Sequence, residues 1–281
     1  MPTIAEALKE AAKRLADHDT GRLDAEVLLG HVLGRGRTHL YTWPEQRLSE
    51  EQADRFEACI RRRAAGQPIA HLTGHREFWD LDLQVTPDTL IPRPETELLL
   101  EAALARIPAD AEWRLADLGT GSGAIALALA SERPKCRVVA VDRSVPALAV
   151  ARSNAERAGL VNVQWLTGSW FEPLGEDRFR LIVSNPPYVR EGDPCLLEGD
   201  VRFEPRTALT SGSDGLDAIR RLVTGAPPHL EAGGWLLLEH GFDQGSAVRQ
   251  LLDNAGFANV FTERDLSGQE RISGGQMEKP S

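Results

Sequence analysis

Apolar residues recur with a helical period along the first part of the chain. In residues 4–15 and 23–33 they stand three or four positions apart, which is the pattern of helices with one buried face. Ser49 resembles the first residue of a capping box at the start of a further helix, which Gly66 would end. Residues 1–71 are therefore expected to form a small all-helical domain.

The pattern changes to partial alternation in residues 72–93. Apolar and polar residues alternate over part of this stretch, and it also contains turn residues. It therefore predicts a hairpin that links the helical domain to the rest of the chain. Pro94 then suits the first turn of a helix, with Glu95 and Glu97 at the positive end of its dipole. A second domain is expected over residues 94–281.

From residue 113 onward, strand patterns alternate with helical ones. The apolar runs that read as strands are RLADLG, CRVVAVD, VQWLTG, RLIVSNPP and GWLLLEH. Their order predicts an α/β fold, a mostly parallel, doubly wound sheet with helices on both faces. Residues 258–274 read as two more strands in a hairpin, and residues 274–281, GGQMEKPS, are expected to be a loose end.

Composition narrows the class of protein. A chain of 281 residues with 42% hydrophobic and 26% charged residues is an ordinary globular protein. No stretch approaches the roughly 18 apolar residues of a membrane span, and the N-terminus is amphipathic, so we expect a soluble protein that is not exported. Cys59, Cys136 and Cys195 are far apart and the histidines are scattered, so we expect no metal site and a cytoplasmic location.

The charge is unevenly distributed along the chain. Residues 1–70 contain 11 basic and 11 acidic residues, so the whole net charge of −10 lies after residue 70. An acidic surface repels phosphate backbones, which argues against a nucleic-acid partner. The one basic cluster, Arg61 to Arg63, precedes Gly66, where cations complement the end of a helix.

A Gly-rich turn follows the first strand of the second domain. It consists of Asp117, Leu118, Gly119, Thr120, Gly121, Ser122 and Gly123, and Asp142 stands at the end of the next strand. In a doubly wound sheet this turn approaches a nucleotide-like ligand, and the later acidic residue binds ribose hydroxyls. The spacing G-x-G-x-G departs from the dinucleotide pattern and favours S-adenosylmethionine; a nicotinamide cofactor and a turn without a ligand remain alternatives.

The fourth strand ends in an NPPY motif, Asn185, Pro186, Pro187 and Tyr188. This strand lies beside the first in a doubly wound sheet, so the motif should face the cofactor. The Asn185 side-chain oxygen and the Pro186 carbonyl could each accept one N–H of a planar amino group, while Tyr188 offers a flat face. Such a clamp would hold the nitrogen about 3 Å from the sulfonium methyl, although a plain Pro-Pro turn is the alternative.

These motifs together resemble a known family, the S-adenosylmethionine-dependent glutamine methyltransferases of class 1 peptide-chain release factors, called PrmC or HemK. The likeness covers nearly the whole chain and rests on IPRPETE at 91–97, DLGTGSG at 117–123, VDRS at 141–144, NPPY, and EPRTAL with DGLDAIR between 204 and 220. It implies a Rossmann-like class I methyltransferase fold. It also implies N5-methylation of the glutamine in the Gly-Gly-Gln loop of release factors.

The resemblance also implies roles for residues. Gly119 to Gly123 would hold the methionine and adenosine parts, Asp142 the ribose and Trp170 the adenine side, while Asn185 to Tyr188 would hold the glutamine amide. The helical domain would dock the release factor, and the acidic domain would suit a basic partner surface. In one departure, Ser169 precedes Trp170 where family members often carry an acidic residue.

Three other functions stay open at this point. The clamp fits the adenine N6 group of nucleic acids equally well, but the acidic second domain and the lack of a target-recognition insertion argue against it. A sister family methylates a glutamine of a ribosomal protein, and a non-catalytic S-adenosylmethionine-binding protein is the third possibility. Gly274, Gly275 and Gln276 repeat the substrate tripeptide, yet truncation after Ile272 is expected to leave activity unchanged.

Overall fold

The protein is described here by a computed structural model, and the structure describes residues 1–278. The chain divides into two compact units. We call them the helical unit, residues 1–75 with 197–203, and the sheet unit, residues 76–196 and from 204 onward. Among the helices of the described residues, none is long and apolar enough to cross a membrane.

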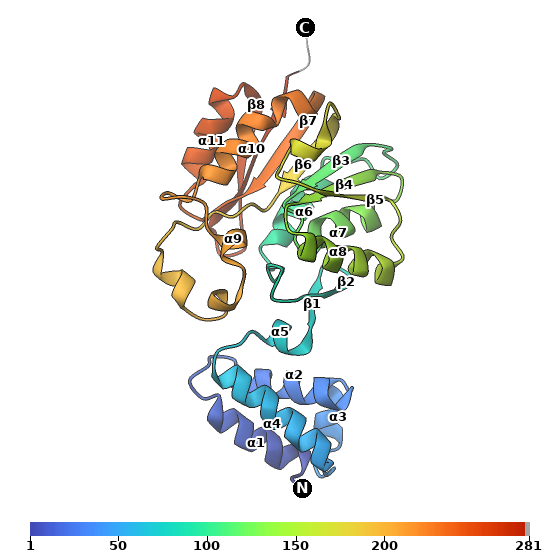
Figure 1. Ribbon diagram of the computed structural model, residues 1–281, viewed down its shortest axis with the longest axis vertical. Coiled ribbons are helices and arrows are strands. Elements are labelled where there is room, and N and C mark those ends of the chain that lie inside the picture. The colour runs from blue at the N-terminus through green and yellow to red at the C-terminus, as the bar shows by residue number, and fades with distance from the viewer. Residues whose placement is uncertain (279–281) are drawn as a thin grey trace. The chain divides into compact units, whose positions relative to one another are not determined.

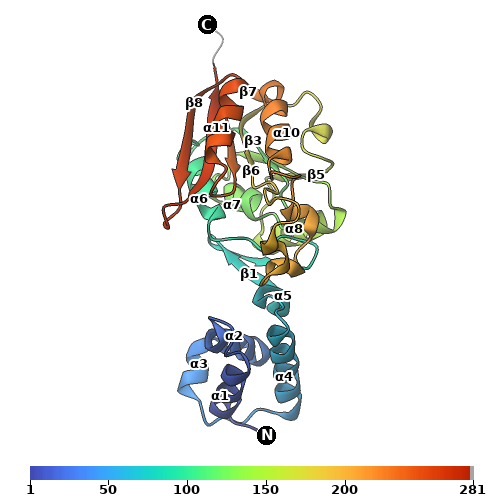
Figure 2. The same cartoon turned by 90° about the vertical axis from the view of Figure 1, so that its left-hand side faces the viewer.

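The helical unit packs short helices around one apolar core (Figures 1 and 2). They are α1 (Ile4–Arg14), α2 (Gly21–Leu33), α3 (Arg37–Thr42), α4 (Glu50–Ala64) and α5 (Ile69–Thr73). The capping box predicted at Ser49 is confirmed, because Gln52 N donates to Ser49 Oγ at 3.1 Å and Ser49 N donates to Gln52 Oε1 at 2.9 Å. Gly66, with φ of 91°, follows the end of α4.

A buried ion-pair network joins a distant segment to these helices. Arg63 is 7% exposed. It donates to Asp24 Oδ2 of α2 at 2.7 Å and to Asp200 Oδ1 at 2.8 Å. Arg202 adds a hydrogen bond to the carbonyl of Ala65. These contacts explain why residues 197–203 belong to the helical unit, and Arg63 is thus a buried structural residue within the basic cluster.

The sheet unit contains a seven-stranded sheet in the order β5-β4-β3-β6-β7-β9-β8 (Figure 1). The strands are β3 (Arg114–Leu118), β4 (Arg137–Asp142), β5 (Val163–Thr167), β6 (Phe179–Ser184), β7 (Leu230–Glu239), β8 (Phe257–Arg264) and β9 (Glu270–Met277). The pairs among β3 to β7 are parallel, and β9 pairs antiparallel with both β7 and β8. The predicted mostly parallel sheet with an antiparallel C-terminal hairpin is confirmed.

Helices cover both faces of this sheet (Figures 1 and 2). The first face packs against α6 (Thr96–Leu104), α7 (Ala124–Glu132) and α8 (Val145–Ala158), and the second against α10 (Asp217–Gly225) and α11 (Gly245–Asn254). Alternate strand residues supply the two cores, since Leu181 faces the first and Ile182 the second. Two short strands, β1 (His75–Phe78) and β2 (Leu81–Gln84), form a separate two-stranded sheet, and α9 (Arg206–Leu209) is a single short helix.

The C-terminal tripeptide is built into the sheet, so the expected loose end is wrong for residues 274–277. A β carbon on Gly274 would lie 2.6 Å from the Leu237 side chain, and Gln276 Nε2 donates to the carbonyl of Gly233 at 2.9 Å. Truncation after Ile272 would remove most of β9 from between β7 and β8. Residues 279–281 of the expected loose end lie outside the described residues.

Candidate active site

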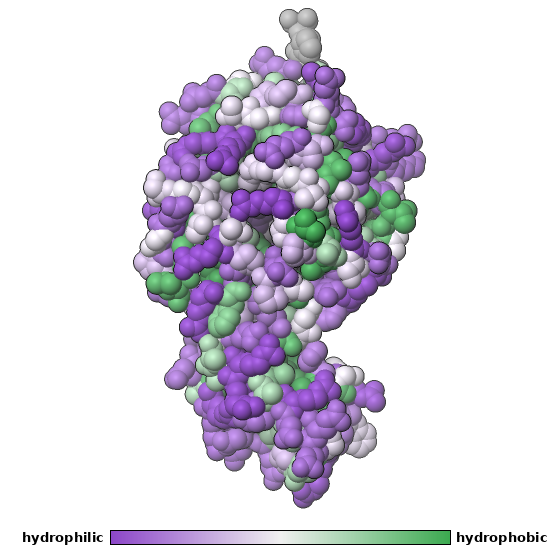
Figure 3. Space-filling view, viewed as in Figure 1, coloured by the Kyte–Doolittle hydropathy of each residue, from purple (hydrophilic) through white to green (hydrophobic). Residues whose placement is uncertain are grey.

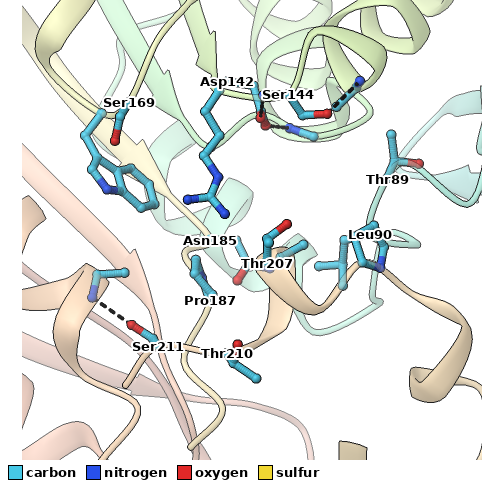
Figure 4. A pocket seen from close by; sticks show the side chains of 18 of the residues that line it. Thr89, Leu90, Asp142, Ser144, Ser169, Asn185, Pro187, Thr207, Thr210 and Ser211 are labelled. Carbon is cyan, nitrogen blue, oxygen red and sulfur yellow. Dashed lines mark hydrogen bonds between the residues drawn. The ribbon is translucent and has the colours of Figure 1, made fainter. Parts of the chain in front are cut away.

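A cavity of about 470 Å³ opens in the sheet unit at the carboxyl ends of β3, β4 and β6. β3 lies between β4 and β6, so the sheet order reverses at this point, where open α/β sheets bind ligands. Figure 4 shows Asp142 at one end of the cavity, Thr210 at the other, and Asn185 with Pro187 between them. The Gly-rich turn and the NPPY motif therefore line one cavity.

The Gly-rich turn contributes backbone to the cavity wall. Gly119 and Gly121 line the cavity, with φ values of 79° and 56°. A β carbon on Gly119 would lie 3.3 Å from the Trp170 ring. Glycine is thus favoured at position 119 both by its backbone angle and by the close approach of this ring.

The Asp142 carboxylate is held at the cavity wall by backbone groups. Its Oδ2 accepts from the Gly121 N–H at 2.9 Å, and its Oδ1 accepts from the Ser144 N–H at 2.8 Å. Each carboxylate oxygen can accept a further hydrogen bond. The carboxylate is therefore positioned to receive hydroxyl groups of a ligand in the cavity.

Asp117 lies beneath the Gly-rich turn and does not line the cavity. It is completely buried, and its Oδ2 accepts from the Thr120 hydroxyl at 2.6 Å and the Ala126 N–H at 3.2 Å. Its Oδ1 is buried without a hydrogen-bond partner in the described structure. Burial raises the pKa of Asp117 to about 7. This carboxyl braces the turn from below.

The other predicted residues of the turn also support it from outside the cavity. Thr120 and Ser122 are buried, and the Ser122 carbonyl accepts from Asn154 Nδ2 at 2.9 Å. Gly123 immediately precedes α7 as its N-cap, and a β carbon there would lie 3.1 to 3.3 Å from three neighbouring side chains. These positions hold the turn against the sheet and α8.

Trp170 forms a wall of the cavity next to Gly119. It adopts φ of 52° and also packs against the apolar core of the second sheet face. Ser169, which also lines the cavity, donates its N–H to Glu172 Oε2 at 3.2 Å. The acidic side chain that contacts this loop is therefore that of Glu172, three residues after Ser169.

The NPPY motif divides between the cavity and the core. Asn185 and Pro187 line the cavity, whereas Pro186 and Tyr188 do not. Asn185 Nδ2 donates to Thr96 Oγ1 at 3.0 Å. The Tyr188 hydroxyl donates to Glu239 Oε1 at 3.0 Å, so its ring anchors the motif to the core.

Glu239, at the end of β7, is the second buried carboxyl near the cavity. It is 1% exposed, and its Oε2 has no hydrogen-bond partner among residues 1–278. Burial raises the pKa of Glu239 to about 7, although the neighbouring Thr96 and Tyr188 hydroxyls lower it. Sequence patterns predicted no role for Thr96 or Glu239, because the partners of both residues are distant in the chain.

Two further segments complete the cavity. They are residues 87–90 before α6, and a wall formed by Pro205, Thr207, Ala208, Thr210, Ser211, Gly212, Asp217, Ala218 and Arg221. Buried Glu204 joins them, since it accepts from the Ile91 N–H at 2.9 Å and pairs with Arg93. The IPRPETE and EPRTAL motifs are therefore linked by direct contacts, which the sequence pattern alone did not reveal.

Metal ligands are not grouped in the described part of the chain. No set of three or more His, Cys, Asp or Glu side chains among residues 1–278 is arranged to hold a metal ion.

Figure 3 shows that hydrophilic side chains cover much of the visible face of the sheet unit, with small hydrophobic patches and a hollow between them.

Comparison with known proteins gives consistent results for both parts of the chain. The family described as the PrmC N-terminal domain matches residues 6–74, and the methyltransferase small domain matches residues 94–196. The release factor glutamine methyltransferase of Pseudomonas aeruginosa is 55% identical over 276 residues, covering 98% of this chain and 99% of that protein. The Escherichia coli protein of the same name is 50% identical and covers 96% and 97%.

A solved structure supports the fold. The methyltransferase from Pyrococcus furiosus superposes with a TM-score of 0.55 at 20% identity, and the match covers 78% of this chain and 98% of that one. The likeness applies to the architecture of the sheet and its helices.

Proposed function

The chain belongs to the release factor glutamine methyltransferases, and we propose that its cavity divides into a cofactor half and an amide half. The enzyme transfers a methyl group from S-adenosylmethionine to N5 of the glutamine side chain in the Gly-Gly-Gln loop of class 1 release factors. The observation that carries the division is that Gly119, Asp142 and Asn185 line one cavity from three adjacent strand ends.

The residues present fit S-adenosylmethionine. A volume of about 470 Å³ is within the usual range for small-molecule sites. The backbone of Gly119 and Gly121 can approach a ligand closely, and the fixed Asp142 carboxylate suits ribose hydroxyls. We assign Trp170 to the adenine side, because it lines the cavity next to Gly119. When bound, the cofactor supplies an electrophilic methyl group on its sulfonium.

The amide half orients a poor nucleophile. The lone pair of a carboxamide nitrogen is delocalised, so the nitrogen attacks only when it is held in a productive direction. Asn185 Oδ1 would accept one N–H of the substrate glutamine. The second would go to the carbonyl of Pro186, which lies between two cavity-lining residues and is restricted by the ring of Pro187. This positioning is the main contribution of the chain to the rate.

Proton release needs no dedicated base in this scheme. The amide proton becomes acidic once nitrogen is alkylated and can pass to water. Asp142 is committed to two backbone N–H groups, and Asp117 is buried below the turn. We therefore assign neither Asp142 nor Asp117 as a general base.

For the partner, we propose that the helical unit docks the release factor. Its equal numbers of basic and acidic residues over 1–70 do not favour a nucleic-acid surface, whereas the acidic remainder suits a basic protein surface near the methylated loop. Binding of the release factor should weaken as salt rises, and salt-insensitive binding would contradict this charge argument. The free cysteines fit a cytoplasmic enzyme.

The experiment that tests the function follows transfer of a labelled methyl group from S-adenosylmethionine. Three substrates are compared: an intact release factor, the same factor with its loop glutamine changed to alanine, and adenine-containing DNA or RNA. We expect label in the intact factor alone. Label in the nucleic acid would mean that the clamp holds adenine, and equal label in both factors would place the target elsewhere.

A further inference from the structure

We propose that Thr96 and Glu239 are positioning residues that fix which end of the Asn185 side chain faces the substrate. This inference rests on the proposed role of Asn185 as the acceptor for the glutamine amide. The two ends of an Asn side chain have the same shape but opposite hydrogen-bonding character. An Asn that turned its NH2 toward the cavity would oppose the N–H groups of the substrate.

The nitrogen end of Asn185 is committed to Thr96. Asn185 Nδ2 donates to Thr96 Oγ1 at 3.0 Å, and the Thr96 side chain is 4% exposed at the start of α6. With its nitrogen directed at Thr96, the Asn185 carbonyl oxygen is the end left for the cavity. The arrangement holds only while the Thr96 oxygen acts as an acceptor toward Asn185.

Glu239 determines where the Thr96 proton goes. The Thr96 hydroxyl lies beside the buried Glu239 carboxyl, whose Oε2 has no hydrogen-bond partner among residues 1–278. An ionised carboxylate has only acceptors, so it attracts the Thr96 proton and leaves the Thr96 lone pair for Asn185. A protonated Glu239 could instead donate to Thr96, whose own proton would then be free to point at Asn185 and favour the reversed amide.

The NPPY motif is tied to the same carboxyl from its other end. The Tyr188 hydroxyl donates to Glu239 Oε1 at 3.0 Å, and Gln244 Nε2 donates to the Tyr188 carbonyl at 3.0 Å. Glu239 thus contacts the motif directly through Tyr188 and indirectly through Thr96. The Tyr188 hydroxyl belongs to this network, and the flat face of its ring packs against the apolar core of the second sheet face.

The network predicts a pH dependence of turnover. The charged and titratable groups around Glu239 are Tyr188 after β6, Arg271 on β9 and Glu95 before α6. Burial raises the pKa of Glu239 to about 7, and Arg271 opposes this rise while Glu95 adds to it. The ionised form is the one that orients Asn185, so kcat should fall as the pH drops below about 7.

The test compares kcat, KM and cofactor binding for Thr96→Val, Thr96→Ser, Glu239→Gln and Asn185→Ala. Thr96→Val keeps the shape but removes the acceptor, so kcat should fall about 10- to 100-fold while the Kd for S-adenosylmethionine stays within about twofold. Thr96→Ser restores the hydroxyl and should recover kcat to within about threefold of the wild type. Glu239→Gln should lower kcat and abolish its decline between pH 8 and pH 6.

Several outcomes would overturn the proposal. They are wild-type kcat in Thr96→Val, equal impairment of Thr96→Ser and Thr96→Val, or an unchanged pH profile in Glu239→Gln. The pH profile decides alone if Thr96→Val does not fold. Asn185→Ala distinguishes failure of the proposed function from failure of the positioning network. An active Asn185→Ala enzyme refutes the role of Asn185 itself. An inactive Asn185→Ala enzyme together with an unaffected Thr96→Val enzyme refutes only the positioning network.

Discussion

A buried carboxyl supports each half of the active site, but the two carboxyls have different kinds of hydrogen-bond partners. Asp117 supports the cofactor half and Glu239 the amide half. Both side chains are buried, and burial raises the pKa of each to about 7. The partners of Asp117 are Thr120 and Ala126, within nine residues of it. Glu239 instead accepts a hydrogen bond from Tyr188, which is 51 residues away, and lies beside Thr96 at the start of α6.

The two carboxyls therefore differ in what brings their partners to them. The partners of Asp117 are close to it in the sequence, whereas the partners of Glu239 come close only through the fold. One strand-turn-helix unit forms the base of the cofactor half, and its geometry follows from neighbouring residues. The amide half needs α6, the end of β6 and the end of β7 to meet. We therefore expect substitutions in the cofactor half to change binding of S-adenosylmethionine, and substitutions in the amide half to change turnover.

Asn185→Ala should have the largest effect. The variant removes the acceptor for the substrate amide, so kcat should drop by two to three orders of magnitude, roughly 3–4 kcal/mol of transition-state stabilisation. Cofactor binding, followed by calorimetry, should stay within a few-fold of the wild type. A comparable loss of cofactor binding would show that Asn185 belongs to both halves.

Asp142→Ala should affect the opposite half. Loss of the carboxylate removes an acceptor for the ribose and leaves the Gly121 and Ser144 N–H groups without their partner, so the Kd for S-adenosylmethionine should rise about 10- to 100-fold. Asp142→Asn is the matched variant. Both carboxylate oxygens accept backbone N–H bonds, so the asparagine NH2 would oppose one of them and binding should weaken as well.

The kinetic signature of these variants is specific. At saturating cofactor, Asp142→Ala should retain kcat within about tenfold of the wild type, because the amide half is intact. If Asp142→Ala and Asn185→Ala lost the same share of cofactor binding and of kcat, the two halves would act as one unit. The division of the cavity into a cofactor half and an amide half would then be wrong.

The difference between the two halves also explains what could be read from the sequence. The parallel sheet, the C-terminal hairpin and the Gly-rich turn were predictable, because hydrophobic period and glycine spacing report on short stretches. The contact of Glu204 with Arg93, the attachment of residues 197–203 and the Thr96–Glu239 pair depend on side chains far apart in the chain. The C-terminal Gly-Gly-Gln was misread because β9 inserts between β7 and β8, which needs knowledge of strand order.

Gly119→Ala should have a smaller effect, confined to the cofactor half. The added β carbon would lie 3.3 Å from the Trp170 ring at a backbone φ of 79°, so the ring or the turn must shift. We expect about a tenfold increase in the Kd for the cofactor and a loss of about 1 kcal/mol in stability. Trp170 fluorescence should report the shift, and Gly159→Ala, where a β carbon meets no neighbour, controls for backbone strain alone.

A last effect concerns the pH dependence of stability, and it compares the two carboxyls directly. The folded-state pKa of Asp117, about 7, exceeds its ordinary value of 3.8, so the folded protein binds the proton more tightly than the unfolded chain does. The stability contributed by this protonated carboxyl is complete below about pH 4 and is lost as the pH rises toward 7. The same sign holds for Glu239, from its ordinary value of 4.5 to about 7.

Asp117→Asn and Glu239→Gln resemble the protonated acids and remove this dependence. Urea unfolding at pH 5 and pH 8 should show each variant losing less stability than the wild type on going to pH 8, by an amount of the order of 1–2 kcal/mol. Only Glu239→Gln should also flatten the pH profile of kcat, because only Glu239 acts on Asn185. A flattened pH profile of kcat in Asp117→Asn instead would assign the titrating group to the cofactor half. If the variants and the wild type lost the same stability between pH 5 and pH 8, neither carboxyl would titrate in the folded enzyme.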